Sequence, residues 1–188
     1  MPTTTNATTA TAATPSPHAL PSPSYRALGV ADVAEVLRIQ AQCYGDAYVE
    51  GAAVFARRLQ AAHHCSWAAH ADGALVAYLA AYWSQAGKIT PLQGDFAEVA
   101  QPTVLYLHDM AVQPDWAGRG IARQLLQHAV DAARQRGIER AALVAVQDAQ
   151  PYWERQGFVV CEPADAVQRQ HLHSYGPDAR YMQRWLGA

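Results

Sequence analysis

Two features of the sequence combine residue types and spacing that could do chemistry. His108 lies inside the apolar segment TVLYLHDMAV, and Gly118 and Gly120 follow it in the segment DWAGRGIARQLL. A histidine can accept a proton near neutral pH, because its ordinary pKa is about 6.5. A pair of glycines at a helix start exposes backbone N–H groups at the positive end of the helix, where anions bind. The chemistry indicated is proton transfer close to a site for an anion such as a phosphate.

The glycine pair on its own is weak evidence, because many helices begin after an ordinary structural turn. The segment AGRGIA lacks the Lys-Ser/Thr ending of a P-loop and is not a complete GxGxxG pattern. A nucleotide-hydrolysing function therefore has little support in the sequence, and a plain turn stays open.

The elements that would position these residues alternate between helical and strand patterns. Asp32 is a candidate cap for the first helix, and residues 71–74 are a candidate hairpin turn. Residues 84–102 form a long loop, of a length that is often functional. The expected helices cover residues 32–42, 52–63, 119–136 and 149–156, and the expected strands cover 66–70, 75–83, 103–112, 141–146, 158–161 and 179–185.

Composition limits the class of protein. The chain has 188 residues, 51% of them hydrophobic and 16% charged, with a net charge of -2, which favours one globular domain and gives no argument for a nucleic-acid or membrane partner. Three widely spaced cysteines predict free thiols in a reducing, cytoplasmic compartment. Residues 1–24 contain no Asp, Glu, Lys or Arg and are expected to form a disordered low-complexity tail, with the domain covering 25–188.

Residues 105–158 resemble the GNAT-type N-acetyltransferase superfamily. Three pieces occur in the family's order and spacing: the strand LHDMAV (107–112), the loop AGRGIA (117–122), similar to Q/R-x-x-G-x-G/A, and the segment AQPYWERQGF (149–158), similar to A-x-x-F-Y-E-x-x-G-F. The combination is far more specific than any piece alone.

The resemblance implies an α/β fold, a twisted mixed sheet of six or seven strands flanked by about four helices. It also implies that acetyl-CoA lies between the fourth and fifth strands, with no metal. The pyrophosphate would contact backbone N–H groups of residues 118–122, and the pantetheine arm would pair with Met110 and Val112. The implied cofactor-binding residues are Met110, Ala111, Val112, Ala117, Gly118, Arg119, Gly120, Ile121, Ala122, Arg123, Tyr152 and Trp153.

Two residues depart from the family pattern. Ala117 stands where Arg or Gln is usual, which predicts at most weaker phosphate binding, since Arg119 and Arg123 still supply charge. Trp153 stands where a tyrosine commonly acts as general acid for the leaving thiolate, and an indole N–H cannot usefully give up its proton. The neighbouring Tyr152 is a catalytic candidate, although it points about 100° away on a helix. The general acid stays open.

His108 is the candidate general base. The pattern Leu-His-x-x-Ala-Val is similar to arylalkylamine N-acetyltransferases, in which a histidine at this place serves the path of the proton. The alternative is a half-buried histidine that hydrogen-bonds within the sheet. Tyr106 shares the face of His108 by the two-residue period of a strand and could order a water molecule, whereas Asp109 is expected on the opposite face with a structural role.

The acceptor site is harder to place. In this superfamily the loop between the first two helices often lines it, which makes Tyr44, Tyr48 and Glu50 candidates; Tyr82 and Tyr175 are further candidates, although strand aromatics are usually core. The pairs His63-His64 and His171/His173 invite a zinc site, but no cysteine or acidic residue lies beside them at metal-ligand spacing, so a polar surface is the favoured interpretation.

These observations predict an N-acetyltransferase that moves an acetyl group from acetyl-CoA to a small-molecule amine by direct attack in a ternary complex. Backbone N–H groups of the central strand would polarise the thioester carbonyl. Two alternatives stay open: a protein or peptide N-acetyltransferase, and a catalytically silent CoA-binding sensor. A homodimer is common in the superfamily and is possible here.

Overall fold

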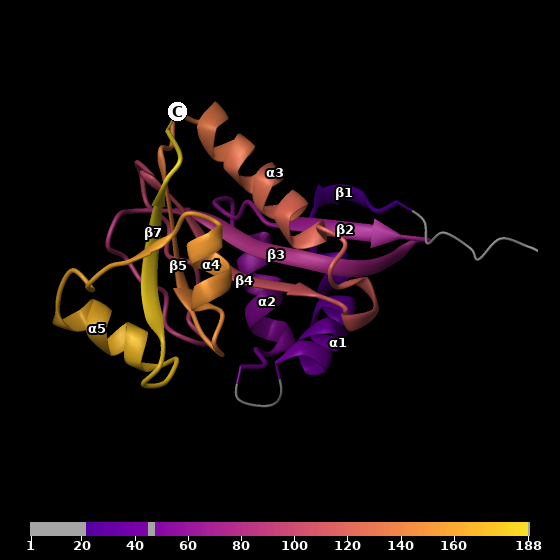
Figure 1. The fold of residues 1–188 in the computed structure, drawn as a ribbon, viewed down its shortest axis with the longest axis horizontal. Coiled ribbons are helices and arrows are strands. Elements are labelled where there is room, and N and C mark those ends of the chain that lie inside the picture. Colours follow the sequence, from indigo (N-terminus) through magenta and orange to yellow (C-terminus); the bar gives the residue numbers. More distant parts are fainter. Residues whose placement is uncertain (1–21, 45–47, 188) are drawn as a thin grey trace, which may run out of the picture.

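The computed structural model describes residues 22–44 and 48–187 of the chain. Its centre is a seven-stranded mixed sheet in the order β1-β2-β3-β4-β5-β7-β6 (Figure 1). The strands are β1 (Ser24–Ala27), β2 (Trp67–Ala71), β3 (Ala74–Ser84), β4 (Val104–Val112), β5 (Arg140–Ala145), β6 (Val159–Val160) and β7 (Arg180–Trp185). The expected α/β fold with six or seven strands is confirmed.

Helices cover both faces of this sheet. Helices α1 (Val33–Cys43) and α2 (Ala52–Gln60) pack on one face, and α3 (Ile121–Gln135) and α4 (Gln150–Arg155) pack on the other. The apolar stripe of α3 explains its position, because Ile121, Leu125, Leu126, Ala129, Val130 and Ala133 are all buried. Strand β3 is covered from both sides, so nearly every one of its residues is buried.

The β2–β3 hairpin closes where the sequence predicts it. Ala71 pairs with Ala74, and the two residues between them, Asp72 and Gly73, have φ angles of 51° and 80°. Two consecutive positive φ angles are the mark of a type I′ turn, whose twist matches that of the flanking strands. The hairpin fixes β3 against β4, the strand that carries His108.

Strands β4 and β5 are parallel but separate early. They share three paired positions, from Leu105↔Ala141 to Leu107↔Leu143, although β4 continues to Val112 and β5 to Ala145. Beyond Leu107 the backbone edge of β4 is therefore not covered by β5. The resemblance implies an opening between the fourth and fifth strands, and the structure has one there.

Several boundaries differ from the prediction. Asp32 does not cap α1 through its side chain; its carboxylate accepts the Gly29 N–H (2.9 Å) and pairs with Arg26. Helix α2 ends at Gln60 rather than residue 63, because the chain becomes extended at Ala61 and then pairs with β3. Helix α3 starts at Ile121 rather than residue 119, because Gly120 has a left-handed backbone.

Two elements were not predicted, β1 and the eight-residue helix α5 (Ala166–His173). Neither has a strong periodic pattern, and α5 buries no residue fully. The expected tail lies mostly outside the described residues, which begin at residue 22. The three cysteines are free thiols. Among the described helices, none is long and apolar enough to cross a membrane.

Candidate functional site

The glycine turn before α3 has the backbone geometry of an anion site. Gly118 and Gly120 have φ angles of +74° and +78°, a region that other residues rarely adopt, and a Cβ at either position would have no atom within 4 Å. The space in front of both glycines is therefore open. Within the described residues, no protein acceptor pairs with the N–H groups of residues 118–123. The turn thus offers unpaired donors at the positive end of a 15-residue helix.

The side chains of this turn divide between solvent and core. Ala117, Arg119 and Arg123 are exposed, and the Arg119 guanidinium lies 5.1 Å from the centre of the Trp116 ring. The Ile121 side chain is buried beneath the helix, so this residue can offer a ligand little besides its N–H. The turn fits a phosphate group through its backbone, with two arginines nearby to add charge.

A cavity of about 170 Å³ lies where β4 and β5 separate. One side is apolar and belongs to the face covered by α3 and α4. The other is polar and belongs to the face covered by α1 and α2. The apolar side includes Leu79, Leu107, Met110, Leu143 and Trp153, and the polar side includes Tyr44, Tyr48, Glu50, His108, Asp109 and Tyr175.

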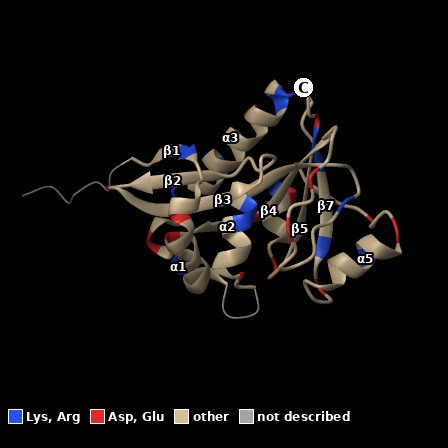
Figure 2. Cartoon of the chain, turned by 180° about the vertical axis from the view of Figure 1, so that it is seen from behind, with Lys and Arg blue, Asp and Glu red and all other residues tan. Residues whose placement is uncertain are grey.

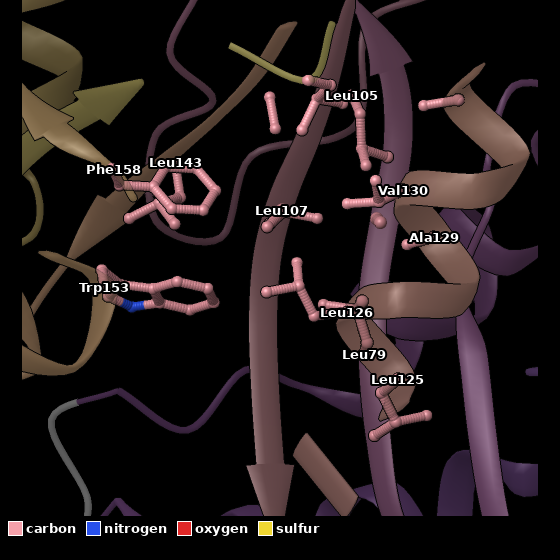
Figure 3. Close-up of a cluster of buried hydrophobic side chains, with 14 of the residues drawn as sticks. Leu79, Leu105, Leu107, Leu125, Leu126, Ala129, Val130, Leu143, Trp153 and Phe158 are labelled. Atoms are coloured by element: carbon pink, nitrogen blue, oxygen red, sulfur yellow. The ribbon is translucent and has the colours of Figure 1, made fainter. Parts of the chain in front are cut away.

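Trp153, and not Tyr152, faces this cavity from α4. The Trp153 ring extends toward Leu107 of β4 (Figure 3) and meets the Phe158 ring edge-on, 5.3 Å between centres. Tyr152 does not line the cavity, and its buried hydroxyl has no partner among the described residues. Burial also raises the pKa of Tyr152. The geometry therefore gives Tyr152 no contact with the cavity and does not support it as a catalytic candidate.

A β-bulge changes the direction of the side chains on β4. Asp109 pairs with Ala80 and Leu107 pairs with Ala81, so His108 is an extra residue without a partner on β3. Asp109 bonds to groups of the α1 and α2 face, and His108 bonds to Glu50 on the same side. The expectation that Asp109 lies on the face opposite His108 is therefore wrong, because the two-residue period is interrupted between them.

His108 is part of a buried chain of charged groups. Its Nε2 lies 2.9 Å from Glu50 Oε2, and both side chains are at most 3% exposed. Arg58 donates to both Glu50 oxygens, at 2.5 and 2.7 Å, and to the carbonyl oxygen of Gly94. Burial by itself would raise the pKa of Glu50, but His108 and Arg58 outweigh it and hold that pKa well below its usual value. Glu50 is therefore a carboxylate in this site.

Asp109 is a second buried carboxyl group in the cavity wall. It accepts hydrogen bonds from the hydroxyls of Tyr44 (2.6 Å) and Tyr78 (2.5 Å) and from the amide of Gln40 (3.0 Å). Burial raises the pKa of Asp109 despite these donors. The Tyr44 hydroxyl also lies 2.7 Å from the Met110 carbonyl oxygen, and burial and Asp109 raise the pKa of Tyr44 well above its usual value. Tyr44 thus joins α1 to the exposed edge of β4.

Of the remaining tyrosine candidates, Tyr175 reaches the cavity. Its hydroxyl donates to the Thr90 carbonyl (2.8 Å) and lies 3.5 Å from His108 Nδ1. Tyr82 stacks on Phe96 and contacts the Thr90 hydroxyl, outside the cavity lining. Tyr106 is also buried outside the lining, with its ring 6.5 Å from that of His108. Their positions therefore do not support the acceptor-site role expected for Tyr82 or the water-ordering role beside His108 expected for Tyr106.

The histidine pairs considered for zinc have other contacts. His63 Nε2 lies 2.8 Å from the Phe96 carbonyl oxygen, and His171 Nδ1 lies 2.7 Å from the Ile89 carbonyl oxygen. Both histidines thus brace the loop of residues 84–102. Over residues 22–44 and 48–187, no group of three potential metal ligands occurs.

Sequence reasoning missed Arg58 and Thr90, which organise the polar side. Arg58 carried a signal, because its spacing places it on the apolar face of α2 with Phe55 and Leu59, where an unpaired charge would be costly. Thr90 lies in a loop without periodicity and gave none. Figure 2 shows that basic and acidic residues are interspersed over the molecule. Among the described residues, no Lys or Arg lines the cavity.

Comparisons with known proteins agree with this fold. Residues 33–158 match the model of the Acetyltransferase (GNAT) family. No curated protein sequence matches the chain. Among solved structures, the ribosomal-protein-S18-alanine N-acetyltransferase of Escherichia coli has a TM-score of 0.65 at 16% identity, over 89% of this chain and 96% of that one. The PaiA N-acetyltransferase of Thermoplasma acidophilum, in complex with coenzyme A, has a TM-score of 0.60 at 15% identity, over 87% and 99%. Ard1 of Thermoplasma volcanium has a TM-score of 0.63 at 14% identity, over 88% of this chain and 99% of that one.

Proposed function

Because this chain belongs to the acetyltransferase (GNAT) family, we propose that it transfers an acetyl group from acetyl-CoA to the primary amine of a small, uncarboxylated molecule. The single observation that carries the acceptor class is the polar side of the cavity, which combines His108 and tyrosines with two carboxyl groups and no cationic lining residue among the described ones. The transfer is direct, without an acyl-enzyme step.

The residues present fit the cofactor side of this reaction. Bound acetyl-CoA would supply the acetyl thioester. The N–H groups of residues 118–123, with Arg119 and Arg123, would hold its phosphates, since their donors are unpaired and the space before both glycines is open. Met110 and Val112 would hold the pantetheine arm through N–H groups on the open edge of β4. Their carbonyl oxygens already face the Tyr44 hydroxyl and the Cys43 thiol.

The acceptor side would attract an ammonium ion and disfavour an acid. Tyrosine rings and the carboxyl group of Asp109 present negative potential to the cavity. A carboxylate on the acceptor would lose its hydration without gaining a cationic partner, which is costly in a buried site. The hydroxyl of Tyr48 bonds to the Tyr175 carbonyl oxygen (3.1 Å), so two chain segments meet across this side. That link favours a small molecule over an extended peptide.

His108 would accept the proton that the amine must lose before it can attack. An alkyl ammonium has a pKa of about 10.4, so roughly one amine in a thousand is neutral at pH 7. Removal of this proton by a group in the cavity wall is general base catalysis. Trp153 cannot return a proton to the sulfur, so we leave that step to solvent or to a hydroxyl of the cavity.

Calorimetry with acetyl-CoA, followed by a free-thiol assay over matched acceptors, tests the proposal. Phenethylamine and phenylalanine form one matched pair, and short peptides with free amino termini form a third class. We expect binding, thiol release with phenethylamine, and at least tenfold less release with phenylalanine. Preference for peptides would favour a protein acetyltransferase. Binding without release on any acceptor would favour the silent CoA-binding sensor that Trp153 suggests.

A further inference from the structure

We propose that Glu50 is a positioning residue that fixes the tautomer of His108 and thereby makes Nδ1 the proton-accepting atom. The inference rests on the proposed function, because it assigns the base of that reaction to one ring nitrogen. It refines the sequence-based expectation, in which Glu50 is a candidate lining residue of the acceptor site.

Glu50 has no oxygen lone pair left for an acceptor. A carboxylate offers about four hydrogen-bond sites. Oε1 accepts from Arg58 Nη2 (2.7 Å) and from the Gln93 backbone N–H (2.8 Å), and Oε2 accepts from Arg58 Nη1 (2.5 Å) and faces His108 Nε2 (2.9 Å). The whole group is 3% exposed. Glu50 is therefore fully engaged by the protein and can act on an acceptor through His108.

The contact with Glu50 determines which nitrogen of His108 carries the proton. An ionised carboxylate only accepts hydrogen bonds, so Nε2 must be the N–H donor. In the neutral ring the other nitrogen, Nδ1, then has a free lone pair. Among the described residues, the hydrogen-bond contact of Nδ1 is with the Tyr175 hydroxyl at 3.5 Å, whose single proton is already donated to the Thr90 carbonyl oxygen at 2.8 Å. No donor therefore blocks Nδ1 on this side.

Arg58 keeps the proton on His108 rather than on Glu50. Its guanidinium holds Glu50 as a carboxylate and is itself fixed by the Gly94 carbonyl oxygen (3.0 Å) and by the Phe96 ring. In the transfer, an N–H bond of the acceptor ammonium breaks and an Nδ1–H bond forms on His108. The new imidazolium charge lies between the Glu50 carboxylate and the hydroxyl oxygen of Tyr175, both of which can stabilise it.

The variant Glu50→Gln makes a specific prediction about the ring. Arg58 donates to both oxygen positions, at Oε1 beside the Gln93 backbone N–H and at Oε2 beside His108 Nε2. The Gln93 N–H can only donate, whereas the His108 ring can change tautomer, so the amide oxygen of glutamine will occupy the position of Oε1. The amide NH₂ will then occupy the position of Oε2 and donate to His108 Nε2. This contact reverses the tautomer and places the proton on Nδ1. Nδ1 then has no free lone pair with which to accept the proton of the amine.

Nitrogen NMR of histidine-labelled, unliganded protein reports the tautomer directly, and steady-state kinetics reports its consequence. We expect the Nε2–H tautomer in the wild type and the Nδ1–H tautomer in Glu50→Gln. We also expect kcat to fall about 100-fold, the scale of general base catalysis, with the affinity for acetyl-CoA unchanged. Glu50→Asp keeps the negative charge, so it should recover part of the Nε2–H tautomer and part of the lost kcat. Asp95→Asn, which neutralises the exposed partner of Arg57, is the matched control.

The outcomes separate this inference from the proposed function. An Nδ1–H tautomer in the wild type, or a Glu50→Gln tautomer change with unaltered kcat, overturns the inference while the acetyltransferase stands. An equal loss in Glu50→Asp and Glu50→Gln, with the Nε2–H tautomer intact in both, also overturns it in favour of a packing role. If no acceptor releases thiol with the wild type, the proposed function fails, and the tautomer shift still supports the control of His108 by Glu50.

Discussion

The cofactor side and the acceptor side proposed for this protein are built in different ways. The cofactor side uses backbone: the glycine turn, the start of α3 and the open edge of β4, all within residues 105–123. The acceptor side uses side chains from segments far apart in the chain, with His108 bonded to Glu50 58 positions away and close to Tyr175, 67 positions away. The cofactor side is a local structure, whereas the acceptor side exists only in the folded protein.

This difference has a consequence for function. A backbone site binds a common ligand while its side chains are free to vary, provided that the glycines stay. A site made of side chains can change its ligand by single substitutions in its loops. In this chain the glycine turn of the cofactor side keeps the family pattern, although Ala117 and Trp153 depart from it, and the acceptor side is built from Glu50, Arg58 and Tyr175.

The largest expected effect comes from Gly120→Glu, which separates the two sides most sharply. A glutamate here places a side chain and a negative charge in the space proposed for the phosphates, so calorimetry should detect no acetyl-CoA binding, a loss of at least about 100-fold, or 2.7 kcal/mol. Gly137→Glu is the matched control, because Gly137 has a φ angle of +72° and equally open surroundings at the other end of α3. An equal loss of acetyl-CoA affinity in both variants would mean that the glycine turn has only a structural role.

The second effect concerns the acceptor side alone. His108→Gln should lower kcat by about 10²- to 10⁴-fold, the range of general base catalysis, with unchanged affinity for acetyl-CoA. The loss should shrink at high pH, where free amine accumulates. His63→Gln is the control, because His63 is also bonded to protein but lies away from the cavity. A small loss that is the same at every pH would leave His108 as a structural histidine.

The sequence predicted several local elements of the fold well for a physical reason. A positive φ angle at Gly120, a helix stripe on α3 and a turn at Asp72-Gly73 depend on neighbouring residues, so local patterns are sufficient. The bulge at His108 depends on how β4 pairs with β3, and the environment of Glu50 depends on Arg58 and Gln93. These contacts come from tertiary structure, which explains why Asp109 was placed on the wrong face and why the bonds of Glu50 to Arg58 and Gln93 were not predicted.

The third effect tests whether the acceptor side is also part of the core. Arg58→Met leaves the Glu50 carboxylate buried without its main partner, so the free energy of unfolding should fall by about 3–5 kcal/mol in denaturant titration. Arg57→Met removes the neighbouring arginine, whose pair with Asp95 is more than half exposed on both sides, and should cost about 0–1 kcal/mol. Similar costs for the two variants would show that the polar side does not support the fold.

The smallest effect uses the two buried carboxyl groups of the acceptor side, whose pKa values shift in opposite directions. The pKa of Glu50 is lowered in the folded protein, so below about pH 4.5, its value when unfolded, the unfolded state binds a proton that the folded state does not. Glu50 therefore contributes stability above this pH that is lost as the pH falls. The pKa of Asp109 is raised, so its contribution is present below about pH 3.8 and is lost as the pH rises.

A comparison of wild type with Glu50→Gln isolates the contribution of Glu50 to stability, because Asp109 is present in both proteins. The difference between their free energies of unfolding should be constant above pH 6 and should shrink below about pH 4.5, by up to about 1.4 kcal/mol per pH unit. Urea titrations at intervals from pH 7 to pH 3 measure it. A difference that stays constant to pH 3 would mean that Glu50 titrates alike in both states, and hence that His108 and Arg58 do not hold it as a carboxylate. The acceptor side would then lack the fixed charge on which the control of His108 depends.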